Sequence, residues 1–481
     1  MKILTTTPVA ATTGSQQTPP RSGASALVET LVHLGVDKVF GYPGGAVLPI
    51  YDALYNEKRL HHILVRHEQA AVHAAEGYAR STGKPGVVVV TSGPGMSNTT
   101  TGLLDAMSDS IPIICISGQV AKPLIGTQAF QECDAIGIAK TVTKWQTQIQ
   151  DVREVVQRTE EAYNRAVSGR PSPVLIDFPK DIQAQLIDSP IGVSLRKTPK
   201  DSAPSEYDIS QAINLILDAK KPIIYGGGGL INSGNLACNT FAKLVSMTKA
   251  PCTLTLMGLG AFPGSHPQFI GMPGMHGTLE ANLALHDSDL IVCVGARFDD
   301  RVTGDVETFA PNSKKIHIDI DPNSINRLVP VDVGLAGDCG DVLSKIVPIL
   351  RAKINTLQDI QPWWAKIHRW QKVKSLNFET KENTIVPQAL IRSIQNATAG
   401  EDPIIATDLG QHQMWAAQHF VFNKPGHWLT SGGAGTMGYG LPAAIGAQLA
   451  HPDKTVICVS GDASILMNIQ ELSTAVQHKT P

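Results

Sequence analysis

A single aspartate near the end of the chain has the surroundings of a metal ligand. Asp462 lies in a glycine-flanked turn (460–464) directly after the apolar run 456–459, which predicts a buried strand. Ligands of open α/β sheets bind outside the carboxyl ends of strands, and Mg²⁺ there takes one or two carboxylates with phosphate oxygens and water. Free amides at the next helix start can hold the phosphates. The turn predicts a diphosphate–metal site, although an aspartate that only caps a helix shows the same pattern.

A glycine-dense segment shortly before the turn favours the ligand interpretation. An apolar run of small residues, 441–450, predicts a helix, and five glycines precede it: Gly432, Gly433, Gly435, Gly438 and Gly440. Glycine allows a backbone to approach a ligand closely. We therefore prefer a diphosphate–metal site over a simple helix cap at Asp462.

Glu68 is the second candidate for chemistry. It follows the strand-like run 62–65 and opens an alanine-rich segment that predicts a helix through Arg80. Apolar surroundings favour the neutral form of a carboxylic acid, so Glu68 could carry a proton into a site of low dielectric. A glutamate at a helix start is also stabilised by the helix dipole without any further role. The residues alone leave both interpretations open.

The middle of the chain places glycines or charged residues after each predicted strand. Strand 222–225 leads into four glycines, strand 290–294 into GARFDDR (295–301), and strand 315–320 carries Asp319 near its end. Such strand ends suit a large polar ligand such as a dinucleotide. The glycine run is not GxGxxG, and a structural turn could explain any one of these features.

Two further loops carry weaker indications. Residues 126–132 offer an amide and an aromatic ring that could face a substrate, and Lys180 follows the strand 174–178 and could meet an anion. A solvated lysine is the more frequent case, and the loop alone is uninformative.

Repeated strand–loop–helix units predict an α/β protein with three doubly wound parallel-sheet domains. Segment 188–207 is rich in Pro, Ser and Lys and predicts a linker. The expected organisation is a disordered tail (1–23), a first domain (24–187), the linker, a second domain (208–351), a helical connection (352–384) and a third domain (385–481).

Composition excludes several classes of partner. The 481 residues carry a net charge of −2, so neither a nucleic acid nor an anionic membrane is an expected partner. No apolar run approaches the length of a membrane span. The seven cysteines are scattered without a CxxC pair, which fits a reducing cytosol. The tail lacks the features of a signal peptide and the arginine content of a typical transit peptide.

Taken together, these segments resemble the catalytic subunits of the acetohydroxyacid synthase (acetolactate synthase) family of thiamine-diphosphate enzymes. The similarity extends from about Ser25 to the last residue. It rests on FGYPGGAVLPIYDALY (40–55), RHEQAAVHAAEGYAR (66–80), TSGPGMSN (91–98), GTQAFQE (126–132), RPSPVLIDFPKD (170–181), GMPGMHGT (271–278), GARFDDRVTG (295–304), HIDIDP (317–322), TDLGQHQMW (407–415) and SGGAGTMGYGLPAAIGA (431–447). GARFDDRVTG with GMPGMHGT separates this family from simpler thiamine-dependent decarboxylases.

The resemblance implies thiamine diphosphate, Mg²⁺ and FAD as cofactors, with the pyrimidine ring held by domain 24–187 and the diphosphate by domain 385–481. Glu68 would protonate the aminopyrimidine, Asp462 would bind Mg²⁺, and Met437 would support the bent cofactor. Further expected thiamine-diphosphate contacts are Gly44, Gly45, Gln411, His412, Gly435, Gly461, Ala463 and Ser464.

By the same resemblance, FAD lies in domain 208–351, where it is structural and undergoes no net redox change. The expected FAD contacts are Arg170, Gly228, Thr255, Leu256, Met275, His276, Gly295, Arg297, Asp299, Asp319 and Asp338. Gln131 and Lys180 would lie near the substrate. Arg301 would pair with the carboxylate of the second 2-ketoacid, a bidentate task that suits a guanidinium.

The implied reaction decarboxylates pyruvate and transfers the hydroxyethyl unit to a second pyruvate, giving 2-acetolactate, or to 2-ketobutyrate, giving 2-aceto-2-hydroxybutyrate. It is the first common step of branched-chain amino acid biosynthesis. The family places each active site at a dimer interface, with Glu68 from one subunit and Asp462 from the other. The resemblance implies a homodimer or tetramer, a small regulatory subunit, and the bacterial cytoplasm or the plastid stroma as location.

Some positions depart from the family pattern. Gln128 stands where the family usually has Asp, Ala434 where it usually has Leu, and Ala463 closes GDA where an older form has GDG. The family's next Mg²⁺ ligand, an Asn, and a tryptophan that favours 2-ketobutyrate would lie beyond Pro481. The chain is therefore expected to be a fragment of a longer product or to hold thiamine diphosphate incompletely.

Two alternatives remain. One is another FAD-containing enzyme of the superfamily, although Glu68 argues against a glyoxylate carboligase, which lacks that residue, and Arg301 argues against a pyruvate oxidase. The other is a non-catalytic chain that serves only in folding or assembly.

Overall fold

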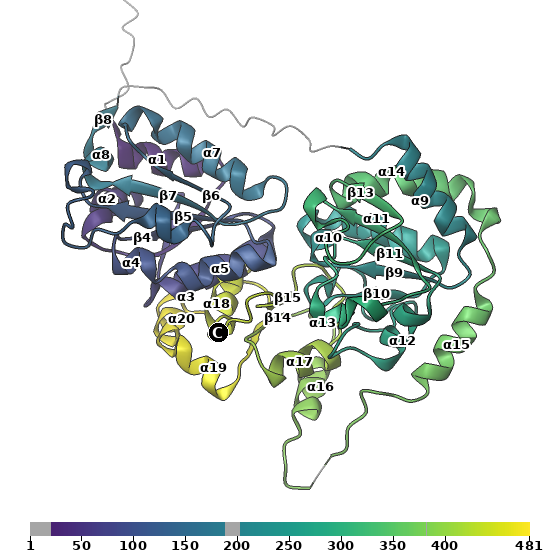
Figure 1. Ribbon diagram of the computed structural model, residues 1–481. Coiled ribbons are helices and arrows are strands. Elements are labelled where there is room, and N and C mark those ends of the chain that lie inside the picture. The colour runs from purple at the N-terminus through teal and green to yellow at the C-terminus, as the bar shows by residue number, and fades with distance from the viewer. Residues whose placement is uncertain (1–20, 188–202, 381) are drawn as a thin grey trace, which may run out of the picture.

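The computed structural model describes residues 21–187, 203–380 and 382–481. These residues form three α/β domains, each built on a parallel sheet, as the sequence predicted (Figure 1). The first and third domains pack against each other, and the middle domain lies beside both. The predicted α/β class with three parallel sheets is therefore confirmed.

The N-terminal domain contains a six-stranded parallel sheet in the order β3-β2-β4-β5-β7-β6. Its strands are β2 (Lys38–Tyr42), β3 (His61–Leu64), β4 (Gly86–Val90), β5 (Ile113–Gln119), β6 (Trp145–Gln148) and β7 (Val174–Pro179). Val87 and Val89 of β4 pack into one core, and Val88 and Val90 into another, because successive side chains of a strand point to opposite faces.

Helices cover both faces of this sheet (Figure 1). On one side lie α1 (Gly23–His33), α2 (Leu48–Asn56), α7 (Val155–Val167) and α8 (Lys180–Ala184); on the other lie α3 (Glu68–Thr82), α4 (Pro94–Ser97), α5 (Thr100–Asp109) and α6 (Ala135–Ala139). This is the doubly wound arrangement expected of repeated strand–helix units.

The middle domain has a five-stranded parallel sheet in the order β10-β9-β11-β12-β13. The strands are β9 (Pro222–Gly226), β10 (Cys252–Leu254), β11 (Leu290–Val294), β12 (Lys314–Asp319) and β13 (Val333–Ala336). Its helices are α9 (Glu206–Asp218), α10 (Gly228–Asn232), α11 (Asn235–Thr248), α12 (Leu279–Asp287), α13 (Asp300–Thr303), α14 (Cys339–Ala352) and α15 (Gln361–Gln371).

The C-terminal domain has three parallel strands in the order β15-β14-β16. They are β14 (Ile404–Thr407), β15 (Trp428–Thr430) and β16 (Val456–Val459), with helices α16 (Pro387–Ala397), α17 (Gln411–His419), α18 (Gly440–Ala450), α19 (Asp462–Met467) and α20 (Leu472–His478). The predicted helix 441–450 and strand 456–459 are thus present.

Helices α3 and α18 join the first and third domains by direct backbone contact. A Cβ atom on Gly77 would lie 2.0 Å from the carbonyl oxygen of Ala443, and one on Gly446 would lie 1.9 Å from that of Ala74. No side chain fits in these spaces, so glycine is required at both positions. The helix that begins at Glu68 is thereby fixed against the helix that follows the glycine loop.

Three predicted boundaries shift in the structure. Arg21–Ser22 forms strand β1, which pairs with β8 (Leu186–Ile187), and Ser22 caps α1, so the tail prediction does not hold for residues 21–23. Residues 1–20 and 188–202 lie outside the described residues. Helix α9 begins inside the predicted linker because the Ser205 hydroxyl accepts a hydrogen bond from the Asp208 amide. Among the described residues of the expected helical connection (352–384), Ala352 ends α14 and Gln361–Gln371 forms α15, and the others are not α-helical.

The surface and the cysteines fit a globular protein. No helix among the described residues combines the length and apolar character needed to cross a bilayer. All seven cysteines are free, and five are buried, as expected of small apolar residues.

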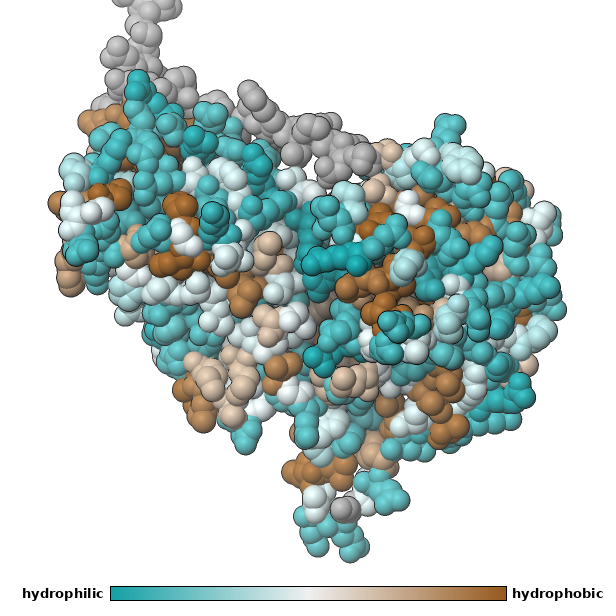
Figure 2. All heavy atoms as spheres, in the orientation of Figure 1, coloured by the Kyte–Doolittle hydropathy of each residue, from teal (hydrophilic) through white to brown (hydrophobic). Residues whose placement is uncertain are grey.

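Figure 2 shows apolar residues at the surface over α19 and α20, where Leu466, Met467, Leu472 and Val476 are exposed.

Candidate active site

A cavity of about 700 Å³ lies at the junction of the three domains. All eleven residues expected to contact FAD line it, together with Arg301 and Gly435. Arg170 comes from the N-terminal domain, and the other ten come from the middle domain. The structure therefore brings together, around one cavity, residues from all three domains, from Arg170 of the first to Gly435 of the third.

The carboxyl ends of neighbouring strands form the floor of this cavity. The Gly227 amide donates to the Val294 carbonyl at 2.9 Å, and the Gly229 amide donates to the Gly295 carbonyl at 2.9 Å. A Cβ atom on Gly229 would lie 2.8 Å from the Cα of Gly295. The loops that follow β9 and β11 are thus in backbone contact, which leaves the space above them open to a ligand.

Charged groups stand around this floor. The Arg170 guanidinium donates from Nε to the Ser110 hydroxyl at 2.7 Å, and burial together with the nearby Arg297 lowers the pKa of Arg170. Asp338 caps α14 by accepting hydrogen bonds from the Gly340 amide at 2.9 Å and the Ser233 hydroxyl at 2.7 Å. Two arginines and the acidic strand ends offer partners for phosphates and for hydroxyl groups of a dinucleotide.

Of the three residues predicted near the substrate, one lies at the cavity. Arg301 lines it with an exposed side chain, whose guanidinium is 3.4 Å from the Asp300 carboxylate. Gln131 is exposed and has a φ of 60°, and its carbonyl would lie 2.9 Å from a Cβ on Gly93. Lys180 is the exposed first residue of α8. These last two residues lie at the carboxyl edge of the N-terminal sheet.

The predicted diphosphate residues gather at the ends of β14 and β16, which are neighbours in the sheet. Asp462 is the exposed first residue of α19. A Cβ atom on Gly461 would lie 2.9 Å from the His412 ring, and the Ser464 hydroxyl donates to the Leu409 carbonyl at 3.4 Å. Gln411 begins α17 beside them. This set of side chains occupies one sheet edge, as a diphosphate site requires.

Two observations at this edge fit an anionic ligand and a cation. The His412 Nε2 atom is buried without a hydrogen-bond partner, and burial lowers the pKa of this imidazole. Behind it, the Asp408 carboxylate accepts hydrogen bonds from the Gly440 amide at 2.7 Å and from the Ser460 hydroxyl, which ties the glycine loop to the turn. Asp462 is exposed, so its carboxylate is available to a cation.

Glu68 lies at a second strand edge, formed by β2, β3 and β4. Its carboxylate accepts a hydrogen bond from Asn98 Nδ2 at 3.0 Å. Gly44 and Gly45 follow β2 next to the loop after β4, since the Ala46 amide donates to the Thr91 hydroxyl at 3.2 Å. Glu68 is half-buried, so its carboxylate is reachable from outside this chain.

Within the described part of the chain, no hydrogen bond joins Glu68 to the 460–464 turn. The C-terminal residues that contact this region are instead in α20 and the turn before it. The Glu471 carboxylate accepts a hydrogen bond from the Arg66 amide at 2.8 Å, and Arg66 Nη2 donates to Gln477 at 2.6 Å. The two expected halves of the thiamine-diphosphate site thus lie at separate edges of one chain.

Comparisons with known proteins agree with the organisation into three domains. Three family models match: the N-terminal TPP binding domain over residues 21–138, the central domain over 209–346 and the C-terminal TPP binding domain over 408–481 of thiamine pyrophosphate enzymes. The chain is 48% identical to the acetolactate synthase large subunit of Haemophilus influenzae over 96% of its own length and 81% of the relative's. The chain belongs to the acetolactate synthase large-subunit family.

Other acetolactate synthases have a similar sequence identity to this chain. Isozyme 3 of Escherichia coli is 47% identical over 96% of this chain and 81% of its own length. The mitochondrial catalytic subunit of Saccharomyces cerevisiae is 43% identical over 96% of this chain and 69% of its own.

Several residues of the site were not assigned from the sequence. Asn98 is the last residue of TSGPGMSN (91–98). Its contact with Glu68 could not be predicted, because the segments after β3 and β4 come together only when the sheet forms. Asp408 directly follows β14, so the strand-end rule applied to Asp462 could have found it. Asp105 and Asp109 lie on α5, where acidic residues in a helical segment are typical of a solvated face.

Proposed function

We propose that this chain is an acetolactate synthase catalytic subunit that uses thiamine diphosphate, Mg²⁺ and FAD. It would decarboxylate pyruvate and transfer the two-carbon unit to a second pyruvate or to 2-ketobutyrate. The observation that carries the proposal is the gathering of eleven expected flavin contacts and Arg301 around one cavity, in a chain of this family. Arg301 is the residue that argues against a pyruvate oxidase.

The residues fit the three groups. The glycine floor, Arg170, Arg297 and Asp338 would hold FAD. Gln411, His412 and the 460–464 turn would hold the diphosphate, with Asp462 as a Mg²⁺ ligand, and the buried unpartnered Nε2 of His412 would gain a partner there. Bound thiamine diphosphate supplies the electron sink that allows pyruvate to lose CO₂. The protein then has to orient substrates, exclude water and move protons.

Glu68 would hold the proton exchanged with the pyrimidine ring. Asn98 fixes one carboxylate oxygen at 3.0 Å, so the carboxyl group is oriented at the mouth of the loops after β2 and β4. A proton carrier works best when its geometry is set before the ligand arrives. Arg301 would bind the carboxylate of the second 2-ketoacid from the cavity edge, because its guanidinium is exposed toward solvent.

We further propose that the active site forms between two copies of the chain, one contributing Glu68 and the other Asp462. Two features support this. Glu68 and Asp462 lie at different sheet edges of one chain and are both accessible, and apolar residues of α19 and α20 are exposed nearby. A small regulatory subunit is a further expected partner, since relatives are named large subunits.

The proposal is tested by incubating the purified chain with pyruvate, thiamine diphosphate, Mg²⁺ and FAD while product, CO₂ and O₂ are measured. Acetolactate and CO₂ should form in equal amounts, without O₂ consumption, because two pyruvates give one acetolactate and one CO₂. Omission of thiamine diphosphate should abolish both products. Uptake of O₂ with acetate formation would identify a pyruvate oxidase instead, and absence of any product would support a non-catalytic role.

A further inference from the structure

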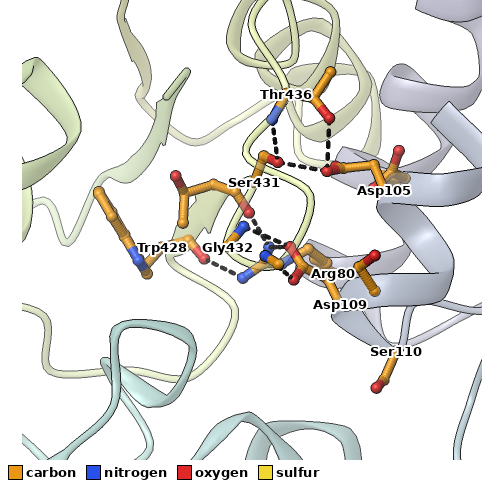
Figure 3. A network of polar contacts seen from close by, with 12 residues as sticks. Arg80, Asp105, Asp109, Ser110, Trp428, Ser431, Gly432 and Thr436 are labelled. Atoms are coloured by element: carbon orange, nitrogen blue, oxygen red, sulfur yellow. Dashed lines mark hydrogen bonds and ion pairs between the residues drawn. The ribbon is translucent and has the colours of Figure 1, made fainter. Parts of the chain in front are cut away.

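Two aspartates of the N-terminal domain hold the glycine loop of the C-terminal domain. Asp109, the last residue of α5, accepts hydrogen bonds from two consecutive backbone amides, those of Gly432 and Gly433, each at 2.7 Å. Its side chain is fully buried. Figure 3 shows Asp105 and Asp109 pointing from α5 toward this loop. The contact joins residues 323 positions apart in the sequence.

Arg80 fixes the strand that leads into the same loop. Its guanidinium donates to the carbonyls of Thr430 at 2.5 Å and Trp428 at 3.2 Å, and it lies 4.0 Å from the Asp109 carboxylate (Figure 3). Burial raises the pKa of Asp109, whereas Arg80 and the two amides favour its charged form. The pair Arg80–Asp109 therefore holds both the end of β15 and the first residues of the loop.

Asp105 closes the other end of the loop. Its Oδ1 atom accepts hydrogen bonds from the Ser431 hydroxyl and, at 2.9 Å, from the Thr436 hydroxyl. The Ser431 oxygen also accepts a hydrogen bond from the Thr436 amide at 2.7 Å. These bonds close residues 431–436 into a ring beside α5, so a shift at one end of the loop moves the other end as well.

The clamped loop lies between the two cofactor sites of the proposed function. Gly432, Gly433 and Gly435 line the cavity together with Asp109, and a Cβ atom on Gly432 would lie 2.2 Å from the Met257 sulfur in the cavity wall. Met437, which directly follows the ring 431–436, is an expected thiamine-diphosphate contact. A displacement of this loop would therefore alter the flavin cavity and the diphosphate side together.

We propose that Asp109, supported by Asp105 and Arg80, is a positioning residue that couples FAD binding to thiamine-diphosphate binding through loop 431–437. Gly432 and Gly433 line the cavity that would hold FAD, and the bonds from Asp109, Asp105 and Arg80 would pass a shift of these glycines on to Gly435 and Met437. The coupling is reciprocal, since each ligand must change the affinity of the other by the same factor. This inference rests on the proposed function for the identity of the two ligands.

The test compares Asp109→Asn with Asp289→Asn as a matched control. Asp289 also accepts hydrogen bonds from two consecutive amides, Lys220 and Lys221 at 2.8 Å each, but it precedes β11 at the opposite sheet edge from the cavity. The Kd of thiamine diphosphate with Mg²⁺ is measured by tryptophan fluorescence with and without saturating FAD. The Kd of FAD is measured by flavin fluorescence with and without thiamine diphosphate.

In the wild type and in Asp289→Asn, each cofactor should tighten the other by about 5-fold or more. For each cofactor, the ratio of its Kd without the other cofactor to its Kd with it should fall close to 1 in Asp109→Asn. The far-UV circular dichroism of this variant should stay unchanged. Should that variant not fold, Ser431→Ala, which removes one hydroxyl from the ring, should lower the same ratios. Equal ratios in all folded variants, or a wild-type ratio of 1, would overturn the inference.

The binding readout separates this inference from the function itself. A wild type that shows coupled binding but forms no acetolactate contradicts only the proposed function. A wild type that forms acetolactate with uncoupled cofactors contradicts only the role of Asp109. A wild type that binds neither cofactor contradicts both.

Discussion

Gly77 on α3 and Ala443 on α18 are in backbone contact, because a Cβ atom on Gly77 would lie 2.0 Å from the Ala443 carbonyl oxygen. Helix α3 begins with Glu68, and α18 follows the glycine loop with Met437. The contact therefore sets the relative position of the N-terminal and C-terminal TPP binding domains within one chain.

Substitution of Gly77 by Ala should destabilise the chain. The added methyl group meets backbone atoms, which cannot move aside as a flexible side chain can, and overpacking of this kind costs about 1–3 kcal/mol. Urea unfolding should show the loss, and the exposed α9 variant Asn214→Ala should stay near the wild type. Equal stability of Gly77→Ala and the wild type would show that the two helices are not packed this closely.

Arg297→Ala should weaken flavin binding. Arg297 lines the cavity, and a charge-assisted hydrogen bond to a phosphate contributes on the order of 1.5–3 kcal/mol. The Kd of FAD, measured by fluorescence titration, should rise about 10- to 100-fold. The matched arginine Arg327 is exposed in the same domain and outside the cavity, so Arg327→Ala should bind FAD as the wild type does. An unchanged Kd in Arg297→Ala would remove this residue from the FAD site.

The free energy of unfolding of the N-terminal domain should depend on pH through the side chain of Asp177. Burial raises the pKa of this β7 carboxyl from 3.8 to about 6, although Gln148 and Gln119 donate hydrogen bonds to it. The folded state therefore binds the proton more tightly than the unfolded state. The contribution of Asp177 to the free energy of unfolding is complete below about pH 4 and is lost as the pH rises through about 6. The loss is on the order of 2–3 kcal/mol.

Asp177→Asn should remove this part of the pH dependence, because an amide does not titrate. Urea unfolding between pH 4 and pH 7 would measure it. The exposed Asp52→Asn variant serves as control and should keep the wild-type profile. If Asp177→Asn shows the same decline as the wild type, another group causes it.

The positions of several cavity residues could be predicted from the sequence because a residue that follows a strand can be recognised from the local pattern. Gly228, Gly295, Asp319 and Asp338 each follow or end a strand of one parallel sheet, and such ends meet at one edge. Their convergence on a single cavity follows from the order of the strands. The resemblance to a known family added Arg170, which no local rule would connect with residues of the middle domain.

Contacts between domains could not be predicted in the same way. Asp109 looks like a solvated residue at the end of an amphipathic helix, and only the packing of the C-terminal domain places Gly432 and Gly433 against it. The segment 352–384 was expected to be helical throughout. Among its described residues after Ala352, the α-helix covers 361–371, where Trp363 and Ile367, four residues apart, pack into the core of the middle domain.

The most direct test of the proposed chemistry is the rate of acetolactate formation by Glu68→Gln at saturating thiamine diphosphate, Mg²⁺, FAD and pyruvate. Glutamine keeps the size of the side chain and its contact with Asn98 but cannot donate an acidic proton. The rate should fall about 100-fold or more, while Glu57→Gln, which lies before β3 at the opposite edge of the same sheet, should keep the wild-type rate. A wild-type rate in Glu68→Gln would contradict the role of Glu68 and the active site built on it.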